Sequence, residues 1–331
     1  MRRQEVGMSA VVRRHSSFRA GSPTDERSLR LREVTRADIH PSLSFSRAAD
    51  LSAHVSSERI VATGVGLDGT LVMLLENEHH EDRADPGPRV SKALFVLPRG
   101  EVKSIELPLD TPLRGPVPQP MEGGGLLIVE ARRLGDHENA WVFDAEGRLI
   151  RRFAAGDGVM HALVDSAGQV WIGYFDEGTV GGDPLSAAGL NRFDVGTGQR
   201  SWTFPMGTRH PRIFDCYALN AAGSEAWAYY LDDGFSLIQV RHDGRIERWE
   251  TNVSGASGVV VSVAGVLLVG TYDQPLAATL FQLGRGRIEH PVAVDVLIPN
   301  DRASLPHTLV SRGDRIYALF PDACYVAELA V

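Results

Sequence analysis

Two histidines stand at corresponding places in the sequence and could do chemistry together. His161 and His307 each precede a short apolar run that ends at a glycine turn. Two imidazoles near neutral pH could serve as general base and general acid, or could ligate a metal. Asp215 and Tyr217 occupy the equivalent stretch of another segment, so we count them as candidate ligand-binding residues. The competing interpretation is that each histidine only hydrogen-bonds water or a backbone carbonyl.

Acidic residues gather where apolar segments end. The candidates are Asp176, Glu177, Asp232, Asp233 and Asp273, with Glu76 and Glu78 at a further segment end. Carboxylates that lie close together could bind a divalent cation such as Ca²⁺ or Mg²⁺, or a cationic ligand. No EF-hand spacing occurs, and a solvated acidic rim is the alternative.

The run at 76–85, ENEHHEDRAD, has the composition of a metal-binding segment. Its adjacent histidines, His79 and His80, would point to different sides of any strand or helix. We therefore interpret the run as an exposed loop. A P-loop, a GxGxxG motif and a GxSxG elbow are all absent from the sequence, so the phosphate-cradling and esterase-type chemistries of those motifs are excluded.

An internal repeat predicts the elements that must position these residues. Six segments begin at a glycine turn and continue as an apolar run; the turn glycines are Gly69, Gly124, Gly168, Gly223, Gly265 and Gly313. Hairpin-like turns alternate with them, centred on Gly100, Gly147, Gly198, Gly244 and Gly286. Each repeat thus holds about four strands in roughly 40 to 56 residues, which is typical of a propeller blade.

We therefore predict an all-β fold, a six-bladed β-propeller of four-stranded blades, with seven blades as the alternative. Residues 1–28 are expected to be a disordered basic leader, and residues 29–331 a single propeller domain. The last repeat lacks a fourth strand, and we expect Leu29–Val34 to supply it and close the ring. The first strand of each blade lines the channel, so His161 and His307 should face the channel mouth from opposite blades.

Composition limits the classes of partner. The chain has 331 residues and a formal charge of −8, and no apolar stretch is long enough to span a membrane. Residues 1–36 carry nine arginines and four acids, but the strongly acidic remainder would repel phosphate, so no nucleic-acid partner is expected. The two cysteines, Cys216 and Cys324, fit reduced core thiols. We expect a cytoplasmic monomer whose partner is a small molecule or a protein.

The run DSAGQVWIG at 165–173 resembles a strand pair of bacterial propellers of the two-component-regulator, NHL and virginiamycin-lyase types. The entries to two repeats, HAL at 161–163 and PHT at 306–308, resemble the entry strand of the lyase-like group. The resemblance implies a bacterial propeller and leaves its activity open. One hypothesis is a propeller that binds a ligand or a protein at the channel mouth and acidic face. The alternative is a metal-assisted lyase or hydrolase that uses His161 and His307.

Overall fold

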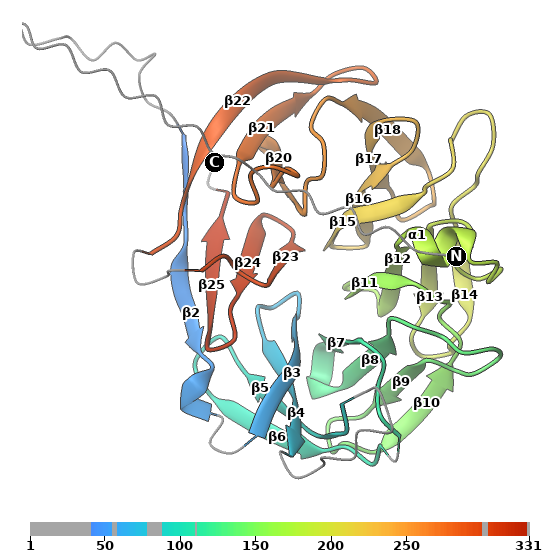
Figure 1. Ribbon diagram of the computed structural model, residues 1–331, viewed down its shortest axis with the longest axis vertical. Helices are drawn as coiled ribbons and strands as arrows, with labels where there is room; N and C mark the ends of the chain where they lie inside the picture. Colours follow the sequence, from blue (N-terminus) through green and yellow to red (C-terminus); the bar gives the residue numbers. More distant parts are fainter. Residues whose placement is uncertain (1–40, 55–57, 78–87, 110, 300–303, 330–331) are drawn as a thin grey trace, which may run out of the picture. The chain divides into compact units, whose positions relative to one another are not determined.

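The computed structural model describes residues 41–54, 58–77, 88–109, 111–299 and 304–329. All of them belong to one compact unit, His40–Val331. Short antiparallel sheets stand around a central axis, which confirms the predicted all-β propeller (Figure 1). Within the described part of the chain, no helix is long and apolar enough to cross a membrane.

The described strands make six four-stranded blades, each running outward from the axis. Blade 1 is β3 (Glu58–Val65), β4 (Leu71–Asn77), β5 (Val90–Val96) and β6 (Val102–Glu106); blade 2 is β7 (Pro116–Pro120), β8 (Leu126–Glu130), β9 (Ala140–Phe143) and β10 (Leu149–Phe153). Blade 3 is β11 (Val159–Val164), β12 (Gln169–Tyr174), β13 (Leu190–Asp194) and β14 (Arg200–Thr203); blade 4 is β15 (Asp215–Ala222), β16 (Glu225–Leu231), β17 (Phe235–Val240) and β18 (Ile246–Thr251). Blade 5 is β19 (Gly258–Ser262), β20 (Gly265–Val269), β21 (Ala278–Leu283) and β22 (Ile288–Leu297). Blade 6 is β23 (Thr308–Arg312), β24 (Arg315–Leu319), β25 (Ala323–Glu328) and β2 (Ser46–Asp50).

Glycine turns set the strand boundaries, as the repeat predicted. Gly168, between β11 and β12, has φ of 72°, and Gly147, between β9 and β10, has φ of 81°. Positive φ is costly for residues with a Cβ, which explains why both kinds of turn use glycine. Six blades fit the repeat count, and the choice of six over seven for the whole chain stays a prediction.

The inner strand of blade 2 has an unusual sequence that its position explains. β7 reads PVPQP, and it pairs with β8 alone. Its other edge faces the axis, where a proline without an N–H breaks no ladder hydrogen bond. Across the axis-facing edge, β3 approaches so closely that a Cβ on Gly64 would collide with the Pro118 carbonyl. Gly64 therefore permits the two inner strands to converge.

The N-terminal part of the described chain closes the ring, but not with the strand that we predicted. β2 pairs antiparallel with β25, Ser46 facing Val326 and Asp50 facing Ala323. Because β24 and β2 occupy both edges of β25, Leu29–Val34 cannot be the closing strand beside it, and that prediction is wrong. Residues 29–34 themselves lie outside the described part, as does the predicted leader. The sequence SRAAD of β2 has little apolar character, which hid it from pattern analysis.

A second short strand reinforces this closure. β1 (Ser42–Ser44) pairs in parallel with β22, so it adds a fifth strand to blade 5. Phe45, between β1 and β2, is buried in a cluster with Phe320 and Tyr325 of blade 6. The single segment Ser42–Asp50 therefore joins blades 5 and 6.

Apolar cores fill the junctions between blades. Of six clusters of buried side chains, one lies at each junction, including the junction of blade 6 with blade 1, where Tyr317 and Leu319 meet Met73 and Leu94. Each blade thus buries both faces against its neighbours. This packing holds the six inner strands around the axis, where the candidate site lies.

Candidate functional site

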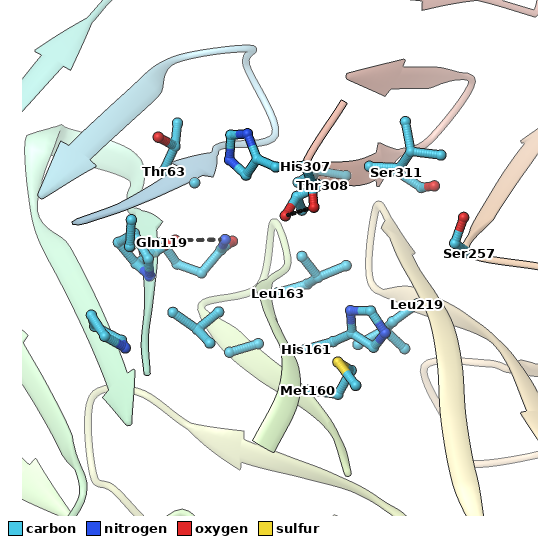
Figure 2. A pocket seen from close by; sticks show the side chains of 18 of the residues that line it. Thr63, Gln119, Met160, His161, Leu163, Leu219, Ser257, His307, Thr308 and Ser311 are labelled. Carbon is cyan, nitrogen blue, oxygen red and sulfur yellow. Dashed lines mark hydrogen bonds between the residues drawn. The ribbon is translucent and has the colours of Figure 1, made fainter. Parts of the chain in front are cut away.

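A cup opens on the propeller axis, surrounded by the first strands of the blades. Its volume is about 270 Å³. Figure 2 shows lining side chains from all six blades, among them Thr63, Gln119, His161, Leu219, Ser257 and His307. Among the described residues that line it, no aspartate, glutamate, lysine or arginine occurs.

A buried arginine lies just beyond the inner end of the cup and is not itself part of the lining. Arg312, the last residue of β23, donates from Nε to the Val65 carbonyl of blade 1 (2.9 Å) and from Nη1 to the Val164 carbonyl of blade 3 (3.1 Å). Its Nη2 donates to the side-chain oxygen of Gln119 of blade 2. Burial lowers the pKa of Arg312 to about 9, so the guanidinium still carries its charge at neutral pH.

Asn220 and Ser311 complete this floor. Asn220, at the end of the inner strand of blade 4, donates to the Val259 carbonyl of blade 5 (2.9 Å) and the Gly313 carbonyl of blade 6 (2.7 Å). Its side-chain oxygen accepts from Gly313 N (2.7 Å), and Ser311 Oγ accepts from Val259 N (3.2 Å). We call Arg312, Gln119, Asn220 and Ser311 the floor network. Together with the backbone groups that they contact, these side chains link all six blades and lie across the channel at one end of the cup.

His161 lines the cup, and its ring is hydrogen-bonded to the backbone of the neighbouring blade. It lies on β11, and its Nε2 is 3.2 Å from the Tyr217 carbonyl oxygen of β15. Burial lowers the pKa of His161 to about 4, although contacts with the backbone of Tyr217 and Cys216 oppose the shift. The ring is therefore neutral at pH 7, donating to a backbone carbonyl. This is the structural role that we weighed against catalysis.

His307 is the freer of the two histidines. Its backbone N–H donates to the Leu319 carbonyl (2.9 Å), which fixes the entry to β23. The residue is exposed to the cup, and partial burial lowers the pKa of its imidazole. The structure thus brings both predicted histidines to the same cup, on different sides of it (Figure 2).

Asp215 and Tyr217 belong to a cluster beside the cup, where blades 3, 4 and 5 meet. We call the part of the cluster that holds Asp176 and Asp215 the acidic shoulder. Burial and the negative charge of Asp176 raise the pKa of Asp215 to about 6. The Oδ1 atom of Asp215 is buried and has no hydrogen-bond partner among the described residues. The Tyr217 hydroxyl is 2.5 Å from that of Tyr272, and the two rings meet edge to face. Three of the sequence-predicted residues, Asp176, Asp215 and Tyr217, therefore lie close together.

The remaining acidic candidates do not join this cluster. Glu177 pairs with Arg132, and Asp232 is buried, where it accepts from Ser236 Oγ (2.8 Å) and pairs with Arg248 (2.8 Å). Asp233 and Asp273 are exposed on separate blades. Glu76 pairs with Arg59, while Glu78, His79 and His80 lie outside the described residues. In the described part of the chain, no three His, Cys, Asp or Glu side chains are grouped as metal ligands.

A second cavity adjoins the cup at the junction of blades 6 and 1. Its volume is about 470 Å³, and it shares Val61, Ala62, Thr63 and His307 with the cup. Glu58, Arg59 and Phe320 line its outer part. His307 therefore stands where the cup meets a side cleft.

Sequence reasoning missed the floor network altogether. Arg312 and Asn220 precede glycine turns, where polar residues are ordinary, and Gln119 sits among prolines. One signal was available: Asn220 and Arg312 follow apolar runs that the repeat assigns to inner strands. A polar residue at the end of an inner strand points to the axis or its floor.

Comparison with known proteins assigns no family to this chain. No protein-family model matches the chain, and no curated protein matches it. Among solved structures, virginiamycin B lyase from Staphylococcus aureus has 11% identity and a TM-score of 0.49, and the match covers 88% of this chain and 100% of that one. BamB from Moraxella catarrhalis has 15% identity and a TM-score of 0.45, over 86% of this chain and 97% of that one.

A third similar structure is the extracellular domain of a putative one-component system from B. thetaiotaomicron. It has 9% identity and a TM-score of 0.42, over 85% of this chain and 40% of that one. These likenesses say nothing about activity, and the β-propeller fold of this chain rests on its own blades.

Proposed function

We propose that this protein is a small-molecule-binding propeller whose ligand occupies the central cup. The observation that carries the proposal is the floor network: it closes the channel at one end and leaves a concave, mostly apolar space open at the other. Concave apolar pockets with a few fixed polar groups are the usual form of small-molecule sites. Thr63, Thr308 and His307 supply such groups around the cup.

The enzyme alternative has less support from the geometry. An acid–base pair needs two groups that titrate near the working pH. The pKa of His161 is lowered to about 4 and its Nε2 faces a backbone carbonyl, so only His307 is placed to exchange a proton in the cup. Carboxylates do not supply the second group, because none lines the cup among the described residues.

The acidic face plays a separate part in this proposal. Asp176 and Asp215 lie on the shoulder, and the cup lining does not include them. Their place is beside the mouth, where loops vary without disturbing the sheets. We assign the ligand itself to the cup.

The test is to block the cup without disturbing the core. Thr308 is exposed within the cup, so Thr308→Trp fills the space while leaving the blade junctions intact. Ser166→Trp is the matched control, because Ser166 is exposed in the β11–β12 turn at the opposite end of the axis. A fragment library is screened by ligand-observed NMR against both variants and the unmodified protein.

We expect fragments that bind the unmodified protein and the Ser166→Trp variant to lose binding to Thr308→Trp. Fragments that bind all three proteins equally would show that the ligand site lies elsewhere. A library without any binder would also count against the proposal, since a preformed cup of this size should accept small fragments.

A further inference from the structure

Among the described residues, the charge at the floor of the cup is hydrogen-bonded to neutral groups alone. Arg312 is 3% exposed, and its three hydrogen-bond acceptors are two backbone carbonyls and an amide oxygen, all neutral. No carboxylate of the described residues is recorded in an ion pair with it. A buried cation is costly unless it is paired as well as hydrogen-bonded. Arg312 has the hydrogen bonds and lacks the pair.

The carboxylates that influence Arg312 lie in turns beyond the floor and are otherwise engaged. Asp68 accepts from Thr70 N (2.9 Å) and Thr70 Oγ1 (2.8 Å) in the β3–β4 turn. Asp165 accepts from Trp171 Nε1 (2.9 Å) in the first hairpin of blade 3. Both turns follow the inner-strand residues that form the floor. The charges of Asp68 and Asp165 therefore act on Arg312 from the side of the floor that faces away from the cup. On the cup side, no carboxylate of the described residues belongs to the lining.

We propose that the cup selects a small anion, such as a monocarboxylate, whose charge is placed above the Arg312 guanidinium. This inference rests on the proposed function and names its ligand class. An anion in the cup would supply, through a medium of low effective dielectric, the compensation that the floor lacks. The nearest groups to it would be Gln119, whose oxygen is already directed at Arg312, and the hydroxyls of Thr63 and Thr308.

Other features of the lining agree with an anion. The Pro118 carbonyl, which would repel one, is already capped by Gln119 Nε2 (2.9 Å). The acidic shoulder of Asp176 and Asp215 stands nearer to solvent, where salt screens charges over about 8 Å. The buried guanidinium is screened much less, so it decides the equilibrium preference while the shoulder affects the rate of entry.

Three probes of the same shape test the sign of the charge. Benzoate, benzamide and benzylamine differ little in size and carry a negative, zero and positive charge. Their dissociation constants are measured by ligand-observed NMR at pH 7.5, with the Thr308→Trp variant used to identify binding in the cup. We expect benzoate to bind at least tenfold more tightly than benzamide, and benzylamine to be the weakest.

A charge-neutralising variant gives a second readout that does not depend on losing the fold. Gln119→Glu keeps the shape of the side chain and sets a carboxylate against Arg312. It should weaken benzoate binding tenfold or more and weaken benzamide binding much less. Ser166→Glu, which adds the same charge at the other end of the axis, should change neither.

The outcomes separate the two proposals. Cup binding in which benzamide or benzylamine equals or exceeds benzoate would overturn the anion inference and leave the proposed function standing. Equal loss of benzoate and benzamide binding in Gln119→Glu would also overturn it, because the effect would then be one of shape. Failure of all three probes to bind would count against both proposals.

Discussion

Replacing Asn220 with leucine tests whether the floor network holds the ring together. Asn220 is fully buried, and its side chain makes three hydrogen bonds, all to backbone groups of blades 5 and 6. Leucine has the same number of side-chain heavy atoms but none that is polar, so it leaves the Val259 carbonyl and the Gly313 N–H without these partners, while the Gly313 carbonyl keeps its hydrogen bond from Val261 N (3.1 Å). It also denies space to a water molecule that could replace them.

The expected loss follows from the number of orphaned groups. A buried polar group left without a partner costs about 1–3 kcal/mol. Two such groups, taken in the lower half of that range, give roughly 2–4 kcal/mol. Native domains are stable by only about 5–15 kcal/mol, so Asn220→Leu should lose a large share of its stability. The melting temperature should fall by roughly 4–16 °C.

The assay is urea denaturation followed by tryptophan fluorescence and circular dichroism. Asn139→Leu is the matched control, since Asn139 is also buried and makes three hydrogen bonds of the same kind, to Glu130, Ala155 and Gly156. Both variants should lose similar stability, but only Asn220→Leu should weaken binding in the cup. A loss below about 1 kcal/mol for Asn220→Leu would refute the reasoning, as would equal weakening of cup binding by the control.

Two further predictions concern buried titratable groups. Because the pKa of Asp215 is raised from 3.8 to about 6, ionisation destabilises the fold as pH rises through that window; Asp215→Asn should therefore gain roughly 1–2 kcal/mol at pH 7.5 and nothing at pH 3.5, measured by urea denaturation. An equal gain at both pH values would contradict this. Burial raises the pKa of Cys324 to about 12 and that of Cys216 further, so neither thiol should react with a disulfide reagent until urea unfolds the protein. Rapid labelling of the native chain would show that one of them is accessible.

The sequence predicted the strands well because turn chemistry is local. Gly168 and Gly147 adopt positive φ in short hairpins, and that requirement is visible without any knowledge of the fold. The closing strand was misplaced because its identity depends on a partner about 280 residues away. In the sequence, residues 29–34 alternate apolar and polar side chains more clearly than Ser46–Asp50 does. The strand that pairs with β25 is nevertheless Ser46–Asp50.

The candidate site was predictable in part. The repeat assigned His161 and His307 to equivalent positions, and the shared position of inner strands was enough to bring both to the cup. Their environments were not predictable, since the contact of His161 with the Tyr217 carbonyl depends on how blades 3 and 4 pack. The approach of Asp176 to Asp215 likewise depends on the short helix α1 (Asp176–Val180), whose Thr179 hydroxyl donates to the Phe214 carbonyl (2.7 Å).

The choice of arginine for the floor bears on function more than on stability. A well-packed apolar side chain at position 312 could close the channel without burying a charge, and such replacements are often neutral or stabilising when the polar partners are replaced too. Burial of the arginine instead costs desolvation free energy, and the same burial lowers its pKa. Its hydrogen-bond acceptors are all neutral. Stability alone does not explain that arrangement. A fixed positive charge beneath an otherwise uncharged cup does have an explanation if an anion binds above it, because low dielectric and rigid positioning strengthen the attraction that burial makes costly in the empty protein.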